Sequence, residues 1–295
     1  MPKTNGISGT NNNKDSKPRT KPVSLVVLTY SVSPDLEKTL ITLNNLGASV
    51  HYIIEENGKQ NQFTNDATDI TFCCGKSEFR GQSSLNEISI NMMLINNAQS
   101  VFQEAQITKL IDFLQDLAQR YPDLDLKKDI AGLGEVAVQN DQPFPRHIAP
   151  GKLFPWKQLA QQGFGLFLAT TPEQKAEICV SPISPEAKIL DLQTKLREYG
   201  YAIEASGIYD EVTKAWVTRF NQRYVPDETN QLDANLWSKA SQLSLEHIQQ
   251  YLNTKNNINT QLPSSQASFF ASAPAANTID EVDKVSEQAR TLHMK

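Results

Sequence analysis

An amphipathic stretch at residues 103–121 constrains the fold of this chain more than any other segment. Its apolar side chains recur at i, i+3, i+4 and i+7, which predicts a helix with one buried face. Before it, three apolar and β-branched runs at 23–30, 50–54 and 88–95 predict buried strands. Strands that alternate with helices predict an α/β domain, a mixed sheet flanked by helices. The stripe consists of Ile107, Leu110, Ile111, Leu114, Leu117 and Tyr121.

The composition changes after residue 170, which indicates a second domain. We expect the first domain to cover 22–170, followed by a Pro-rich linker at 171–185. A small three-helix all-α domain is predicted over 186–253. The Asn-rich segment 1–21 is predicted to be a disordered leader, and 254–295 a low-complexity, acidic tail without fixed structure.

Charge and cysteine content exclude several classes of protein. The net charge is −5 and there is no long basic run, which argues against a nucleic-acid partner. The chain contains no run of about 18 apolar residues, so the sequence predicts no transmembrane helix. The first residues carry cations without an apolar core, so they do not read as a signal peptide. The three cysteines, Cys73, Cys74 and Cys179, form no disulfide framework, which leaves their redox state open.

Several short motifs follow one another in a recognisable order over roughly 23–250. They are 49–54 (SVHYII), 72–77 (FCCGKS), Arg80-Gly81, Leu85-Asn86, Pro150-Gly151, 154–156 (FPW), 161–165 (QQGFG), and in the second domain Leu192-Gln193, Gly200-Tyr201, Gly207, Asp210 and Arg223-Tyr224. Their order resembles that of a known family, the zinc-dependent N-acetylmuramoyl-L-alanine amidases of type 2. These are related to the peptidoglycan-recognition proteins, and some carry a C-terminal peptidoglycan-binding domain. The resemblance implies the same two-domain fold.

The catalytic positions that the resemblance implies hold the wrong residue types. The three zinc ligands of the family fall on Thr29, Leu133 and Ala149, and its general base falls on Met93. A hydrolytic zinc needs three imidazole, thiolate or carboxylate ligands and one open position for water. Met93 cannot take a proton. We therefore expect no metal, no other cofactor and no catalysis, which makes the chain a pseudo-amidase.

Other side chains are candidates for contact with a substrate. We assign this role to six residues of the first domain, although the pattern favours His51 as a structural strand residue, Trp156 as a core residue and Cys73 as a small buried thiol. Arg80 and Asn86 could instead shape a loop. The full set is His51, Cys73, Arg80, Asn86, His147 and Trp156, with Tyr201, Asp210 and Arg223 as exposed candidates for glycan contact in the second domain.

Three functions follow from this interpretation. The first is an inactive protein that binds peptidoglycan or muramyl peptides and acts as a scaffold with protein subunits of an envelope complex, such as a secretion apparatus. The second is an active amidase that uses a displaced metal or Cys73 as nucleophile. The third is an exported effector that uses the fold as a protein-interaction surface. The expected location is the bacterial envelope or periplasm, or outside the cell.

Overall fold

The fold is that of a computed structural model, which describes residues 16–226 and 232–261. The remaining parts of the predicted leader and of the predicted acidic tail lie outside the described residues. As far as Gln250, the described residues belong to one compact unit.

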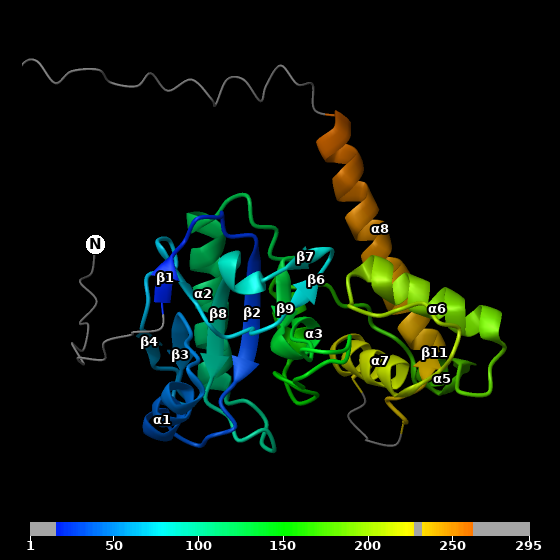
Figure 1. Cartoon of the computed structure of the whole chain (residues 1–295), viewed down its shortest axis with the longest axis horizontal. Coiled ribbons are helices and arrows are strands. Elements are labelled where there is room, and N and C mark those ends of the chain that lie inside the picture. The colour runs from blue at the N-terminus through cyan, green and yellow to red at the C-terminus, as the bar shows by residue number, and fades with distance from the viewer. Residues whose placement is uncertain (1–15, 227–231, 262–295) are drawn as a thin grey trace, which may run out of the picture. The chain divides into compact units, whose positions relative to one another are not determined.

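A five-stranded sheet forms the centre of the first domain (Figure 1). Its order is β4-β3-β8-β2-β9, and every neighbouring pair is parallel except β3 and β4. Strands β2, β3 and β8 match the three predicted apolar runs, because β-branched and apolar residues covered on both faces favour a buried parallel sheet. Neither β4 nor β9 is predicted from the sequence. The five strands are β2 (Leu25–Tyr30), β3 (Tyr52–Ile54), β4 (Gln60–Gln62), β8 (Ser89–Leu94) and β9 (Ile130–Gly132).

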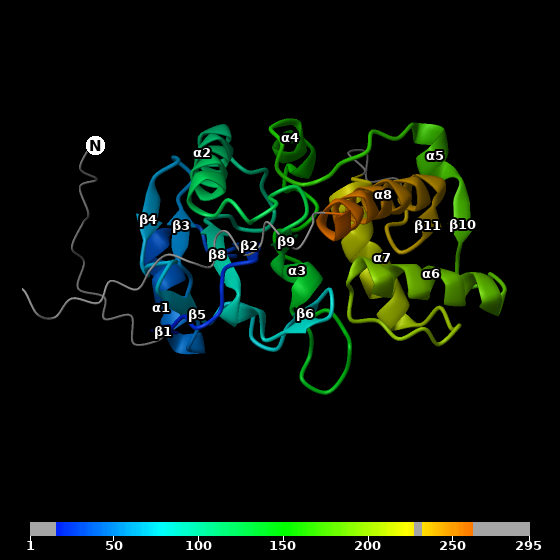
Figure 2. The same ribbon diagram turned by 90° about the horizontal axis from the view of Figure 1, so that it is seen from above.

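Helices α1 and α2 cover opposite faces of this sheet (Figure 2). The predicted amphipathic helix is α2 (Glu104–Arg120), which packs its apolar stripe into the larger hydrophobic cluster. Helix α1 (Leu36–Leu46) begins after Asp35, whose carboxylate accepts a hydrogen bond from the Lys38 backbone N–H at 2.8 Å. It ends at Gly47, whose φ of +60° is the left-handed conformation that glycine adopts without strain.

Short elements complete the first domain. Strand β1 (Ser16–Pro18) lies inside the predicted leader and pairs with β5 (Asp69–Thr71). The Arg19 guanidinium fixes it there by donating to the carbonyls of Asp66, Glu87 and Ser89. The others are β6 (Glu78–Phe79), β7 (Gln82–Ser83), a 3₁₀ turn (Leu85–Glu87), α3 (Leu133–Val136) and α4 (Trp156–Gln161).

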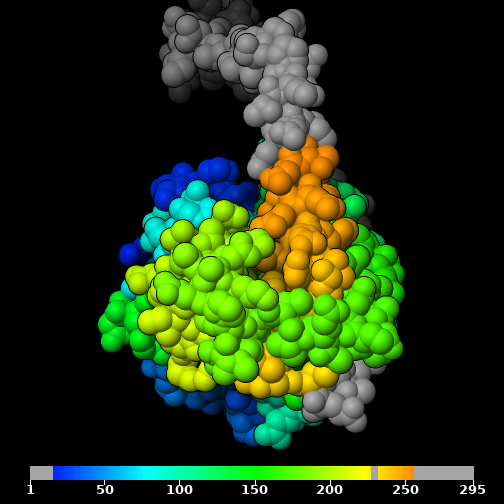
Figure 3. Space-filling view, turned by 90° about the vertical axis from the view of Figure 1, so that its right-hand side faces the viewer, coloured from blue at the N-terminus to red at the C-terminus, as the bar shows by residue number. Residues whose placement is uncertain are grey.

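The second domain consists of helices α6 (Glu186–Tyr199), α7 (Glu211–Tyr224) and α8 (Lys239–Gln261). On the face shown in Figure 3, α6 and α8 lie side by side. The predicted linker contains helix α5 (Pro172–Ala176) and strand β10 (Ile178–Val180). Strand β10 pairs antiparallel with β11 (Trp237–Ser238), which directly precedes α8. Together the two domains confirm the predicted fold class, α/β plus a small all-α domain.

Among the described residues, the structure contains no helix that is both long and apolar enough to span a membrane.

Candidate functional site

The four positions that the family resemblance singles out gather at the carboxyl ends of the parallel strands. Thr29 of β2 and Met93 of β8 are register partners. Leu133 follows β9, and the Gly134 N–H donates to the Ala149 carbonyl at 2.7 Å, which brings the loop before Pro150 onto the start of α3. All four side chains are buried, with 2, 7, 5 and 6 % of their surface exposed, respectively.

These residues do not fit a zinc ion. Leucine and alanine have no donor atoms, and the hydroxyl of Thr29 is a poor zinc ligand. Within residues 16–226 and 232–261, no group of three or more His, Cys, Asp or Glu side chains is placed to hold a metal ion. No step through zinc is therefore derived for this chain.

A cationic side chain, that of Arg219, lies beside Ala149 instead, and the titratable residue His147 stands two positions before Ala149 in the chain. Arg219 of α7 donates from its Nε to the His147 carbonyl at 2.8 Å, and it shares a small notch of about 10 Å³ with Gly134 and Ala149. His147 is half-buried. Burial lowers its pKa, and the positive charges of Arg146 and Arg219 lower it further. His147 is therefore neutral near pH 7, with its ring able to accept a proton.

Sequence reasoning missed Arg219. It lies 72 residues after His147 in the chain, on a helix of the other domain. Its position in the helix gives no sign that it faces the first domain, so only the docking of α7 reveals it. Burial lowers the pKa of Arg219, while its proximity to Tyr30 and Tyr201 opposes that shift.

A buried ion pair joins the two domains next to this notch. The Glu135 carboxylate of α3 contacts the Arg223 guanidinium of α7 at 2.5 Å, and both side chains are about 95 % buried. Glu135 also accepts from the Gly132 N–H and from the Tyr199 and Tyr201 hydroxyls, at 2.8, 3.3 and 3.0 Å. Each carboxylate oxygen thus has two donors, as a buried charge requires.

This network places two predicted glycan contacts away from solvent. Tyr201 and Arg223 are only 2 and 3 % exposed, because α7 and the residue after Gly200 pack against α3. The Arg223 guanidinium also stacks on the Trp156 ring, 4.2 Å from its centroid. Trp156 is itself 6 % exposed and packs against Phe154. The expectation that Tyr201 and Arg223 are exposed is wrong, and both belong to the contact between domains.

The predicted site residue His51 lies in the core. Its ring is fully buried. Nδ1 accepts from the Asn91 backbone N–H at 3.0 Å, which leaves the proton on Nε2, where it can donate to the Asp69 carbonyl at 3.1 Å. Burial lowers the pKa of His51 to about 4, and the nearby Arg19 charge adds to the shift.

We expect this imidazole to make folding stability dependent on pH. Its pKa is about 4 in the folded protein and about 6.5 in the unfolded chain, so the unfolded state binds more protons below pH 6.5. The contribution of the neutral His51 to folding stability is fully present above pH 6.5 and is lost as the pH falls towards 4. Between pH 7 and pH 5 the free energy of unfolding should fall by about 2 kcal/mol. Urea unfolding of wild type and His51→Gln measures it; an equal loss in the variant would contradict the assignment.

The other first-domain candidates lie in a loop beside the sheet. The Asn86 side chain accepts from the backbone N–H groups of Cys73 and Cys74, which shapes that loop. Cys73 packs against the smaller hydrophobic cluster, and burial raises its pKa well above the ordinary value. The Arg80 guanidinium lies over the Phe79 ring and donates to the Lys128 carbonyl at 3.1 Å. All three cysteines are free thiols in the structure.

In the second domain, Asp210 caps α7 by accepting from the Thr213 N–H at 2.8 Å, and its side chain is exposed.

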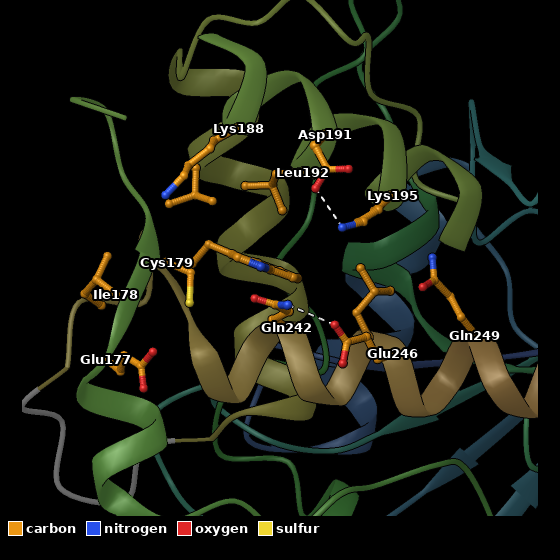
Figure 4. A pocket seen from close by; sticks show the side chains of 13 residues that line it. Glu177, Ile178, Cys179, Lys188, Asp191, Leu192, Lys195, Gln242, Glu246 and Gln249 are labelled. Atoms are coloured by element: carbon orange, nitrogen blue, oxygen red, sulfur yellow. Dashed lines mark hydrogen bonds and ion pairs between the residues drawn. The ribbon is translucent and has the colours of Figure 1, made fainter. Parts of the chain in front are cut away.

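A larger cavity of about 400 Å³ lies between β10, α6 and α8 (Figure 4). Lys188 and Lys195 of α6 face Gln242 and Glu246 of α8 across it. Lys195 is paired with Asp191, and Gln242 donates to Glu246.

Comparison with known proteins matches both domains to families. Residues 19–152 match the model described as "N-acetylmuramoyl-L-alanine amidase", and residues 185–239 match "Putative peptidoglycan binding domain". A "Putative N-acetylmuramoyl-L-alanine amidase" of Rickettsia conorii is 46% identical over 242 residues, which cover 81% of this chain and 90% of the relative. The amidase AmiD of Escherichia coli is 29% identical over 201 residues, 62% of this chain and 68% of AmiD.

Solved structures agree with these matches. A complex of E. coli AmiD with the substrate anhydro-N-acetylmuramic acid-L-Ala-D-γ-Glu-L-Lys aligns with a TM-score of 0.59 and 25% identity, over 76% of this chain and 87% of AmiD. AmpDh3 of Pseudomonas aeruginosa in complex with anhydromuramic pentapeptide has a TM-score of 0.60 at 22% identity, over 83% of this chain and 96% of AmpDh3, and shows the same fold.

These comparisons correct the function that the sequence predicts. The expectations of a catalytically inactive scaffold and of a protein that is not an enzyme are wrong, because the relatives, including one 46% identical along nine-tenths of its length, are named as amidases. The resemblance to the amidases is confirmed. This chain belongs to the N-acetylmuramoyl-L-alanine amidase family.

Proposed function

We propose that the chain acts on peptidoglycan in the bacterial envelope or periplasm, and that it hydrolyses the amide between the N-acetylmuramoyl group and L-alanine. One observation carries this proposal: the 46% identity to a named amidase extends over both domains. The match of residues 185–239 to a peptidoglycan-binding model supports attachment to the same polymer. The substrate in the AmiD complex names the fragment to test.

His147 is the residue that we assign to proton transfer. Water adds across the amide: its oxygen bonds to the carbonyl carbon as the C–N bond breaks, and its proton passes through His147 to the leaving amine of alanine. The lowered pKa of His147 suits this role, since the imidazole is unprotonated at neutral pH. The Arg219 guanidinium beside it adds a fixed positive charge to the site.

Neither of the two other chemistries considered for an amidase has the same support. A displaced metal needs three ligands, and the described part of the chain offers no such group of side chains. A cysteine nucleophile needs an accessible thiolate, whereas burial raises the pKa of Cys73 and so favours the thiol. The activity experiment described below therefore compares samples with EDTA and with added Zn²⁺.

We assign attachment to the wall to the cavity between β10, α6 and α8. Its lining includes lysine and glutamine side chains, which can hydrogen-bond to sugar hydroxyls and peptide carbonyls, together with the apolar side chains of Leu192 and Trp237. Such a mixture of polar and apolar groups is typical of sites that hold a small organic fragment.

Incubation with anhydro-N-acetylmuramic acid-L-Ala-D-γ-Glu-L-Lys tests the proposed activity. We expect mass spectrometry to detect the free tripeptide and the anhydromuramic acid in equal amounts. Parallel samples contain EDTA or added Zn²⁺, and E. coli AmiD serves as the positive control. If AmiD cleaves the fragment while this chain releases no tripeptide in any sample, the proposed activity is overturned.

A further inference from the structure

Arg219 has no acidic partner among the described residues. The ion pairs of arginine in the described part of the chain join Arg80, Arg120 and Arg223 to carboxylates, and none includes Arg219. The titratable groups that act on it are the hydroxyls of Tyr30 and Tyr201, which are neutral at pH 7. Its charge is therefore uncompensated within this part of the protein.

The position of Arg219 is fixed although its charge is unpaired. Its Nε donates to the His147 carbonyl at 2.8 Å, which orients the guanidinium. Its two terminal nitrogens have no acceptor among residues 16–226 and 232–261. The side chain is half-buried and forms one wall of the notch with Gly134 and Ala149. A half-buried cation held in one orientation is suited to bind an anion, because little side-chain entropy is lost on binding.

The neighbouring carboxylate cannot supply that anion. Glu135 lines the same notch, but both of its oxygens are taken by Arg223, the two tyrosine hydroxyls and the Gly132 N–H. Arg223 and Arg219 are one helical turn apart on α7, yet of these two only Arg223 has an acidic partner in the described part of the chain. Arg219 is thus the cation that α7 leaves available to a ligand.

We propose that Arg219 binds a carboxylate of the peptidoglycan stem peptide at the surface beside Ala149, outside the notch, whose volume of about 10 Å³ holds no more than one water. This makes α7 of the second domain part of the substrate-binding surface. A γ-linked glutamate, as in the AmiD ligand, keeps a free α-carboxylate two residues from the muramoyl group. Guanidinium groups bind carboxylates through two parallel hydrogen bonds. The inference rests on the proposed function, since it takes its ligand from the proposed substrate.

Calorimetric titration with N-acetyl-L-Ala-D-γ-Glu-L-Lys tests this assignment. The peptide lacks the muramoyl amide, and its integrity is checked by mass spectrometry. A second peptide carries carboxamides in place of both carboxylates. We expect wild type to bind the carboxylate form about tenfold or more tightly than the carboxamide form, and Arg219→Gln to lose that preference. Arg219→Lys should keep part of it.

Arg197→Gln is the matched control, since Arg197 is exposed on α6 of the same domain and should change neither affinity. Thermal unfolding confirms that each variant is folded. If wild type fails to prefer the carboxylate peptide, or if folded Arg219→Gln keeps the preference, the assignment is overturned. If the preference is found but no amide is cleaved, the binding role stands and only the proposed hydrolysis fails.

Discussion

Arg223→Leu is expected to lower the free energy of unfolding by about 3–5 kcal/mol. The substitution leaves the Glu135 carboxylate buried and without its cation, although the Gly132 N–H and the two tyrosine hydroxyls still reach it. It also removes the donor to the Ile130 carbonyl, 2.9 Å from Nη2. Removing one partner of a buried pair costs far more than the pair contributes, because the remaining charge stays desolvated.

Urea unfolding measures this effect. Replacing both charged residues, in Glu135→Gln/Arg223→Leu, should recover a large part of the loss because no charge is then left buried. Arg197→Leu on the exposed face of α6 is the matched control, with an expected change within about 0.5 kcal/mol. A loss below about 1 kcal/mol in Arg223→Leu would show that the pair does not hold the domains together.

His147→Ala is expected to lower the rate of amide cleavage by about 10²–10⁴-fold, the range for removal of a general base. A base acts in its unprotonated form, and burial with two neighbouring arginines lowers the pKa of His147. The wild-type rate should therefore persist below pH 6.5 and decline only in more acidic solution.

The measurement is the pH profile of kcat with anhydro-N-acetylmuramic acid-L-Ala-D-γ-Glu-L-Lys. His247→Ala, in α8 of the second domain, is the control and should leave both the rate and the profile unchanged. If His147→Ala cleaves the fragment at close to the wild-type rate, proton transfer belongs to another group.

The fold could be predicted because its strands and helices carry local signals. The β2 run is apolar at every position, α2 has a regular stripe, and α1 lies between a capping Asp35 and a terminating Gly47. Each of these signals spans fewer than about 20 residues, within which the backbone conformation is largely decided. Strand β1 gave no such signal, since it is held by the long-range hydrogen bonds of Arg19.

The site could be predicted only in part. Positions 29, 93, 133 and 149 do come together. Their residue types argue against zinc-dependent hydrolysis, but they do not argue against catalysis in general. The local sequence around Tyr201 and Arg223 predicts exposed side chains, because it contains no information on the first domain. Their burial depends on Glu135, 66 and 88 residues away in the chain. No local pattern contains a contact of that range.

The pairing of β10 with β11 has a practical consequence for anyone who transplants the helical part onto another protein. Strand β10 precedes α6 and α7 in the chain and β11 follows them, so the pairing of these two strands ties the start of the helical part to its later portion. A fragment that starts at residue 185 would lack β10 and would expose the edge of β11 at Trp237. A fragment that starts before Thr171 keeps both the capping box of α5 and the β10–β11 pair, so a graft should start there.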